Sequence, residues 1–86
     1  MLKLGEFYNM GNGAYYYGYE RTGKYVSYLH IVLREKQYLV GNTAEEVYFQ
    51  QYFNINDEHI VRSKSRVLKL KRIVIKELFN IHSRLD

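Results

Sequence analysis

AYYYGYERTGKYVSYLHIVLREKQYLVG, residues 14–41, is rich in the aromatic and β-branched side chains that are typical of strands. Two short breaks interrupt it, one that ends in Gly23 and one made of charged residues at 34–36. Gly23 is able to take the positive φ that a hairpin turn requires. We therefore predict a three-stranded antiparallel meander, with strands at residues 14–19, 24–33 and 37–40 and Gly41 as the end of the last strand.

The side chains of the middle strand are expected to divide between the two faces of the sheet, because successive strand residues point to opposite sides. One face carries Leu29, Ile31 and Leu33. The other face carries Tyr28, His30 and Val32.

The segments on either side of the meander are predicted from turn and capping residues. Gly11-Asn12-Gly13 indicates a turn or a flexible entry segment, and residues 1–13 are expected to form a flexible N-terminal segment before the sheet. After the sheet, Thr43 and Glu46 have the spacing of a capping box, in which each side chain bonds a backbone N–H at the helix start. A helix is therefore predicted over residues 43–54.

A second helix is predicted over residues 65–82. Its apolar side chains recur at helical spacings of three and four; they are Val67, Leu70, Val74, Leu78 and Ile81. Residues 58–63 fit either a strand or a lead-in to this helix. The predicted fold class is α+β, a single domain of 86 residues with a three-stranded antiparallel meander followed by two helices, the second basic and amphipathic.

Positive charge is concentrated in residues 62–76, which hold seven Lys and Arg and no acidic residue. Residues 1–58 have a charge balance of −2 and residues 59–86 a balance of +6, so the net charge of +4 averages two unlike parts. This concentration favours a polyanionic partner, which is nucleic acid, an anionic membrane or an acidic protein face. The alternative interpretation is an ordinary solvated helix surface.

The residues expected to contact phosphates lie on the basic helix and in the hairpin turns. On the helix they are Lys64, Arg66, Lys69, Arg72 and Lys76. In the hairpins they are Arg21, Lys24, Arg34 and Lys36. Contacts of this kind supply affinity without reading the base sequence.

Tyrosine occurs ten times, and several copies fall on the predicted strands. Such rings form a platform that stacks bases or contacts a protein partner. The candidates are Tyr15, Tyr17, Tyr19 and Tyr28. The alternative is that several of them cover one side of a thin sheet as part of the core. One layer of helices covers only one face of a sheet, so some tyrosines are expected to stay exposed.

The chain offers little for catalysis. It contains no cysteine, which excludes disulfides, thiol chemistry and cysteine-type zinc sites. Its histidines lack a metal-binding spacing, and its serines lack a nucleophile-elbow context. We therefore predict no enzymatic activity, no cofactor, no metal and no small-molecule substrate. Without a signal-peptide pattern or an apolar run of about 20 residues, a cytoplasmic protein with no transmembrane segment is expected.

Residues 14–53 resemble the DNA-binding domains that consist of a three-stranded sheet and a helix, the AP2-type domain and the arm-binding domain of tyrosine recombinases. The matching pieces are Tyr16-Tyr-Gly-Tyr19, Gly23-Lys24, Arg34-Glu-Lys36, Tyr38-Leu-Val-Gly41 and Thr43-Ala-Glu-Glu46. The resemblance implies a sheet that enters the major groove of DNA. In that family Arg and Trp on the strands make the base contacts, whereas this chain has no Trp, so only the hairpin cations are carried over. The resemblance does not account for the basic helix.

These patterns predict a small, non-enzymatic nucleic-acid-binding protein, with DNA the preferred ligand over RNA. The alternative is a protein-binding inhibitor or adaptor of the kind found among very small, Tyr-rich, Cys-free chains of viruses and mobile elements. Such a protein would dock on an acidic partner surface through its tyrosines and its basic helix. A homodimer would be one way for so small a chain to bury more apolar surface.

Overall fold

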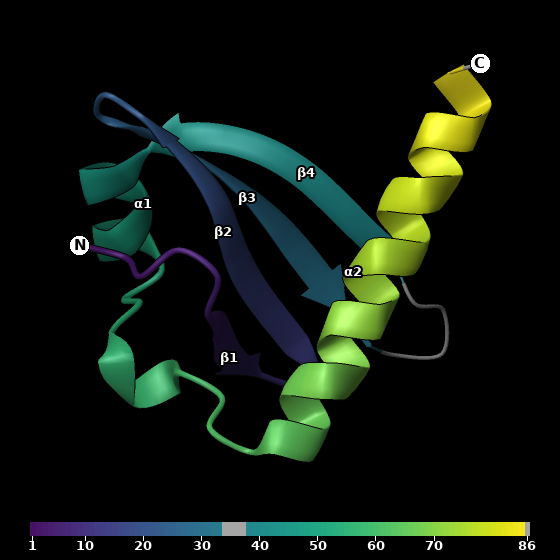
Figure 1. The fold of residues 1–86 in the computed structure, drawn as a ribbon. Helices are drawn as coiled ribbons and strands as arrows, with labels where there is room; N and C mark the ends of the chain where they lie inside the picture. The colour runs from purple at the N-terminus through teal and green to yellow at the C-terminus, as the bar shows by residue number, and fades with distance from the viewer. Residues whose placement is uncertain (34–37, 86) are drawn as a thin grey trace.

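The computed structural model describes residues 1–33 and 38–85, and within them it has an α+β fold (Figure 1). Four strands of this part form one antiparallel sheet, in which each strand pairs with its neighbour in sequence. The strands are β1 (Phe7–Gly11), β2 (Ala14–Thr22), β3 (Tyr25–Val32) and β4 (Tyr38–Glu45). The helices are α1 (Glu46–Tyr52), the short 3-10 helix η1 (Asp57–His59) and α2 (Lys64–Leu85).

Helices α1 and α2 pack on opposite faces of the sheet, which therefore has a core on each side (Figure 1). The α2-side core contains Phe7, Tyr15, Leu29, Ile31, Val61, Leu70 and Val74. The α1-side core contains Leu2, Tyr8, Tyr16, Val26, Tyr28, Phe49 and Ile55. The predicted alternation along β3 is confirmed, because Leu29 and Ile31 lie in one core and Tyr28 lies in the other.

The prediction of three strands is wrong, because β1 adds a fourth strand within the segment that we expected to lie outside the sheet. β1 pairs with β2 and contributes one buried ring to each core, Phe7 on one side and Tyr8 on the other. Because consecutive residues of β1 are buried on both faces, the strand lacks the alternation of apolar and polar residues that the sequence analysis relied on. The turn at residues 11–13 is confirmed, and it joins β1 to β2.

The expected end of the third strand and the expected capping box are also wrong. β4 continues past Gly41 to Glu45 and pairs with β3 along its whole length. Thr43 therefore lies in a strand, where its hydroxyl is 3.1 Å from that of Ser27 on β3. The helix begins only at Glu46, and Glu45 caps it without a side-chain hydrogen bond. Continued pairing with β3 satisfies the backbone groups that a longer helix would have used.

The predicted helix end near residue 54 has a structural cause. Asn54 has a positive φ of 51°, its N–H donates to the Gln51 carbonyl, and the Ile55 N–H donates to the Gln50 carbonyl. This pair of bonds is a Schellman motif, in which a left-handed residue stops the helix and the next apolar residue packs inward. Ile55 is buried in the α1-side core, so the motif also fixes the direction of the chain.

The ambiguous segment at residues 58–63 begins with the end of η1 and then touches the sheet edge. Ile60 forms an isolated bridge with Tyr8, and the Val61 N–H donates to the Phe7 carbonyl at 2.8 Å. The second predicted helix is confirmed as α2, which begins one residue earlier and ends three residues later than expected. Leu70, whose exposed fraction is 0%, anchors it in the α2-side core.

Gly13→Ala should destabilise the protein by about 2–3 kcal/mol. Gly13 has a φ of +74°, and a Cβ there would lie 2.7 Å from the Leu33 carbonyl oxygen. Gly23→Ala is the matched control, because its φ is +58° and its Cβ would meet nothing within 4 Å. We expect that control to cost only about 1 kcal/mol of conformational strain. If guanidinium chloride unfolding showed the same loss of unfolding free energy for both variants, the close contact with the Leu33 carbonyl oxygen would not be the cause of the destabilisation.

Candidate nucleic-acid interface

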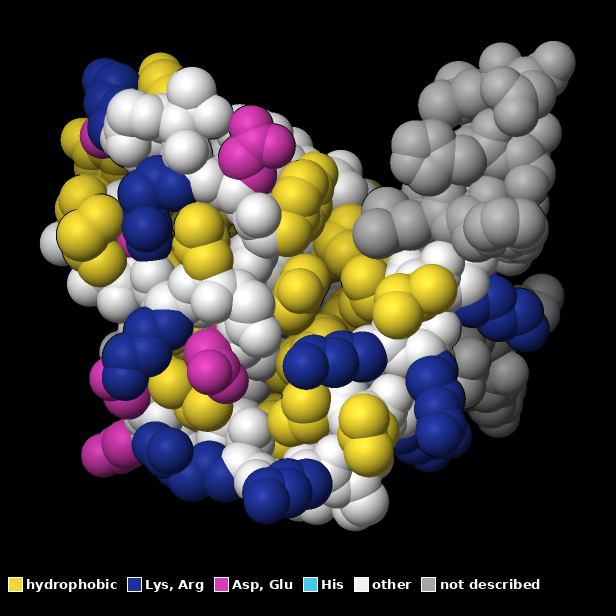
Figure 2. Space-filling view, viewed as in Figure 1, with side chains coloured by type: hydrophobic (Ala, Val, Ile, Leu, Met, Phe, Trp, Pro, Cys, Tyr) yellow, Lys and Arg dark blue, Asp and Glu magenta, His cyan; other side chains and the backbone are white. Residues whose placement is uncertain are grey.

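The surface of α2 that faces solvent is dominated by cations. Leu70 and Val74 point into the core, so residues on the other side of the helix are exposed. Among the described side chains of α2, the exposed cations are Lys64, Arg66, Lys69, Lys71, Arg72 and Lys76. Figure 2 shows Lys and Arg side chains around the N-terminal half of this helix. Five of these six residues were predicted from the sequence, and Lys71 is the addition.

None of the ion pairs among the described residues involves a cation of residues 62–76. Those pairs join Lys3 to Asp57, Arg21 to Glu46 and Lys24 to Glu45. The basic helix surface therefore keeps its charge available for an external anion. A surface of one sign attracts oppositely charged ligands and raises their rate of association.

Arg66 is held in place by a buried tyrosine. Its Nη1 donates to the Tyr15 hydroxyl at 2.7 Å, which fixes the orientation of the guanidinium. A hollow of about 290 Å³ lies beside it, lined by Leu33, Ser63, Ser65, Arg66, Lys69 and Leu70. Hydroxyl, guanidinium and ammonium donors surround this hollow, and these are the groups that bind phosphate oxygens.

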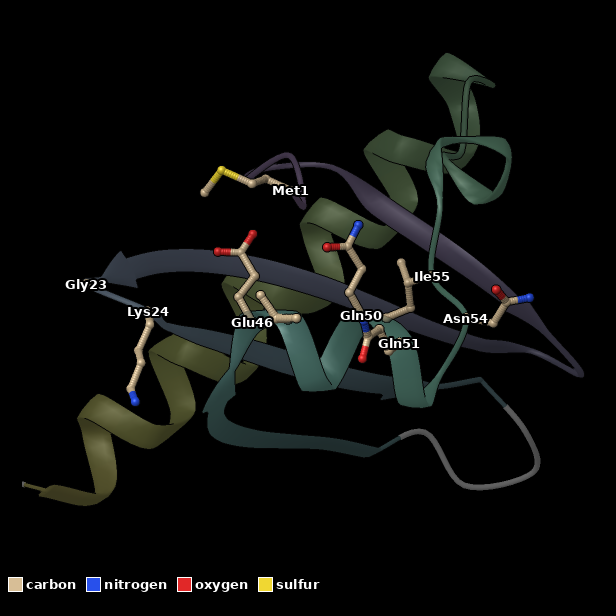
Figure 3. Close-up of a pocket in the computed structure, with 9 residues that line it drawn as sticks. Met1, Gly23, Lys24, Glu46, Gln50, Gln51, Asn54 and Ile55 are labelled. Atoms are coloured by element: carbon tan, nitrogen blue, oxygen red, sulfur yellow. The ribbon is translucent and has the colours of Figure 1, made fainter.

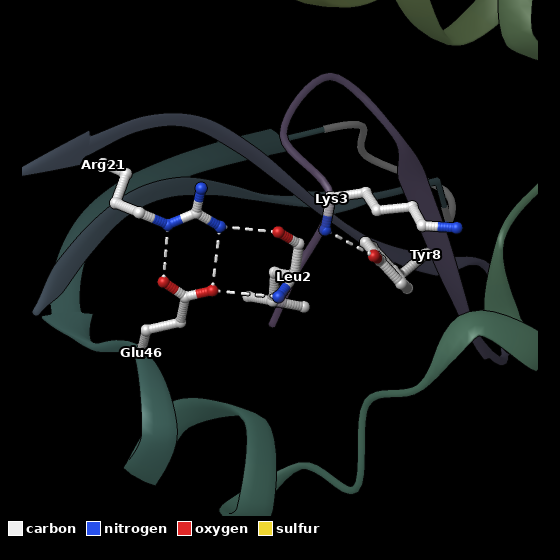
Figure 4. A network of polar contacts seen from close by, with 5 residues as sticks. All are labelled: Leu2, Lys3, Tyr8, Arg21 and Glu46. Carbon is white, nitrogen blue, oxygen red and sulfur yellow. Dashed lines mark hydrogen bonds and ion pairs between the residues drawn. The ribbon is translucent and has the colours of Figure 1, made fainter.

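Arg21 belongs to a different arrangement, a partly buried network that joins three segments (Figure 4). Its Nε donates to Glu46 Oε1 at 2.7 Å, and its Nη2 donates to Glu46 Oε2 at 2.9 Å and to the Leu2 carbonyl at 2.6 Å. The Leu2 N–H completes the network by donating to Glu46 Oε2 at 2.9 Å. The hydrogen bonds from Arg21 hold the pKa of Glu46 below its ordinary value of 4.5. The predicted phosphate contact Arg21 is therefore bonded within the fold.

The other predicted hairpin cations have different surroundings. Lys24 is exposed, with its Nζ 4.0 Å from Glu45 Oε2 and 5.6 Å from the centroid of the Tyr25 ring. Arg34 and Lys36 lie outside the described residues. Of the predicted hairpin contacts, only Lys24 is therefore placed at a described and exposed position.

The four tyrosines singled out from the sequence separate by depth. Tyr15 and Tyr28 are buried in opposite cores, because helices cover both faces of the sheet rather than one. Tyr17 is half-buried and stacks on Phe7 with 4.4 Å between ring centroids. Tyr19 is 50% exposed. Tyr17 and Tyr19 also line a hollow of about 300 Å³ between β2 and α2, together with Leu29, Val74 and Ile75.

The sequence interpretation missed an exposed aromatic patch on α1. Its members are Val47, Tyr48, Tyr52 and Phe53, with exposed fractions of 58%, 67%, 83% and 36%. Phe49 is buried in the α1-side core. Tyr48 and Tyr52 lie four residues apart, and so they share one side of the helix, which faces solvent. That spacing was visible in the sequence and would have identified the patch.

A larger hollow of about 470 Å³ lies where the N-terminal segment, the β2–β3 turn and α1 meet (Figure 3). Glu46 and Gln50 extend from α1 toward the N-terminal segment in this view. Glu46 is already bonded to Arg21, and the remaining polar side chains include the amides of Gln50, Gln51 and Asn54. These groups do not provide the paired acid and base that general acid–base catalysis needs.

His59 and His30 both contact neighbouring residues within the fold. His59 Nδ1 accepts a hydrogen bond from the Asn56 N–H at 3.2 Å and thereby caps η1. His30 stacks on Tyr16, and burial lowers its pKa below 6.5, so the ring is neutral at neutral pH. Among the described residues, no group of three or more His, Cys, Asp and Glu side chains is placed to hold a metal ion.

The helices in the described part of the chain lack the combination of length and apolarity that a membrane crossing requires. Comparisons of the chain with protein-family models, with curated proteins and with solved structures found no match.

Proposed function

We propose that this chain is a small, non-enzymatic nucleic-acid-binding protein that contacts phosphates through the basic face of α2, with DNA preferred over RNA. The observation that carries the proposal is the set of six exposed cations on one helix, none of which takes part in an ion pair among the described residues. Nucleic acid supplies the regularly spaced anions that such a row of cations matches.

The geometry of α2 suits a phosphate backbone because its cations lie along one rigid element. Lys69, Arg72 and Lys76 are three or four residues apart, so their side chains are neighbours on the helix surface. Arg66 and Lys69 line the hollow at the start of the helix, and Lys64 is exposed in the first turn. Lys24, Arg34 and Lys36 remain proposed as secondary contacts from the hairpins, whereas Arg21 is proposed to hold the fold together.

The proposal predicts a steep dependence of affinity on salt. If five cations each neutralise one phosphate, log K should fall by about 4.5 for each tenfold rise in salt, at about 0.9 per contact. Fluorescence anisotropy of labelled duplex DNA, duplex RNA and single strands, titrated at two salt concentrations, measures this slope. Affinities weaker than about 10 μM for every form at low salt would overturn the proposal, because non-specific binders reach this range at physiological salt.

A second candidate function, a protein-binding inhibitor or adaptor, is favoured by the aromatic patch on α1. Four large apolar side chains are exposed within seven consecutive residues there, Val47 to Phe53. Exposed aromatic clusters are enriched at the centres of protein interfaces. This candidate uses a different surface from the basic helix, so substitutions that leave the fold intact separate the two.

A further inference from the structure

The α2-side face of the sheet continues beyond the part that the core of α2 covers. There β2 and β3 form one wall of the 300 Å³ hollow, with Tyr17, Tyr19 and Leu29 in its lining. Val74 and Ile75 of α2 form the opposite wall, and Ile75 is 66% exposed. Figure 2 shows hydrophobic side chains lining a depression in the middle of this face.

The rings in this hollow are arranged to receive a flat apolar group. Stacking on Phe7, with an interplanar angle of 25°, fixes the plane of Tyr17. Tyr19 is half exposed beside it, and no charged side chain appears among the described lining residues. Tyr25 lies farther along β3 and is less suitable, because Lys24 is placed over its ring.

Cations stand next to the hollow on the same helix that forms its wall. Lys71 and Arg72 precede Ile75 by four and three residues, and both are exposed. Residues three or four apart on a helix are about 5–6 Å apart at Cβ. A ligand with its flat ring in the hollow would therefore hold an attached anion within reach of these side chains.

A planar ring covalently linked to a repeating anion is the repeating unit of a nucleic acid. In a duplex the ring faces are hidden by stacking on neighbouring base pairs, whereas in a single strand they are free to stack on aromatic side chains. We infer that the protein binds single-stranded nucleic acid, with one unpaired base seated against Tyr19 in the hollow and the adjacent phosphates on α2. This inference rests on the proposed function and specifies its ligand class.

The test compares strands that differ only in their bases. The probes are a labelled thymidine strand of about 12 nucleotides, an abasic strand of the same length, and a duplex that contains the thymidine strand. The wild-type protein should bind the thymidine strand about tenfold more tightly than the abasic strand, since stacking of one base has this size. Tyr19→Ala should reduce the ratio to about twofold or less, and Tyr19→Phe should retain it.

Tyr48→Ala is the matched control, because that tyrosine is exposed on α1 and should leave the ratio unchanged. Equal, salt-dependent binding to the thymidine and abasic strands would overturn the inference and leave the proposed function standing. Tighter binding to the duplex would do the same. Absence of binding to all three probes would overturn both. A monomer–dimer equilibrium that shifts in Tyr19→Ala, with no change in the ratio, would assign the hollow to a second copy of the chain and also overturn the inference.

Discussion

Replacement of Lys69, Arg72 and Lys76 together by glutamine should lower affinity for nucleic acid by about 10²–10³-fold at about 0.1 M salt. Each phosphate contact contributes about 0.9 decade of affinity between about 1 M and 0.1 M salt, through the release of a condensed counterion. Three lost contacts therefore remove about 2.7 decades, and they lower the slope of log K against log salt by the same amount. Glutamate at the three positions adds repulsion and should abolish binding.

The expected loss is large because these three cations have no compensating role in the fold. They are exposed, and none of them makes a described hydrogen bond or ion pair. Glutamine also has good helix propensity, so α2 should remain intact. Far-UV circular dichroism and the unfolding midpoint of the triple variant should match those of the wild type, which would assign the loss to charge.

Two control variants separate this mechanism from its rivals. Lys3→Gln removes a cation that pairs with Asp57 on another element, and it should leave the salt slope unchanged. Tyr48→Ala with Tyr52→Ala disrupts the α1 patch and should leave nucleic-acid affinity within about twofold, because neither ring is charged. A triple glutamine variant that keeps the wild-type slope would show that α2 does not contact phosphates.

The helical parts of the fold were accessible from the sequence because they depend on regular, local patterns. The spacing of Val67, Leu70 and Val74 predicted the buried side of α2, and the same spacing placed Lys69, Arg72 and Lys76 on its exposed side. Both follow from the 3.6-residue period alone. The charge distribution of the candidate interface was therefore predictable before its position relative to the sheet was known.

The remaining features depend on contacts between distant residues, which a local pattern does not contain. Thr43 and Glu46 have the spacing of a capping box, yet Thr43 pairs across the sheet and Glu46 meets Arg21, 25 residues away. β1 is recognisable only once Phe7 and Tyr8 are seen to face two separate cores. For the same reason the sequence did not predict that Tyr15 is buried and Tyr19 is exposed, because both lie on one strand face and the pattern treats them alike.

Arg21→Met should destabilise the protein, because it leaves the buried Glu46 carboxylate without its partner. The side chain of Glu46 is 6% exposed and that of Arg21 is 28% exposed. Water therefore solvates an unpaired Glu46 carboxylate less well than it would solvate an unpaired Arg21. A domain of this size has a free energy of unfolding of only about 5–10 kcal/mol. Guanidinium chloride unfolding at pH 7 should therefore show a much lower midpoint for this variant.

A double-mutant cycle with Glu46→Met isolates the interaction. The losses of the two single variants should together exceed the loss of the double variant by about 1–3 kcal/mol, since the double variant buries no unpaired charge. It should not recover the wild-type stability, because the Leu2 N–H loses its partner on α1 and the Leu2 carbonyl loses its partner on β2. A loss below about 1 kcal/mol for Arg21→Met would show that the pair is screened by solvent.

The pH dependence of stability gives an independent test of the same network. Because Arg21 lowers the pKa of Glu46 in the folded state, the unfolded chain takes up the proton first as the pH falls. The stabilisation is therefore complete above the ordinary value of 4.5, and it is lost as the pH falls from there through the folded pKa. Glu46→Gln, which cannot titrate, should flatten the decline of the free energy of unfolding in this window. Glu58→Gln removes an exposed carboxylate and should leave the decline in place. If Glu46→Gln remained as sensitive to acid as the wild type, other carboxylates would have to account for the acid dependence.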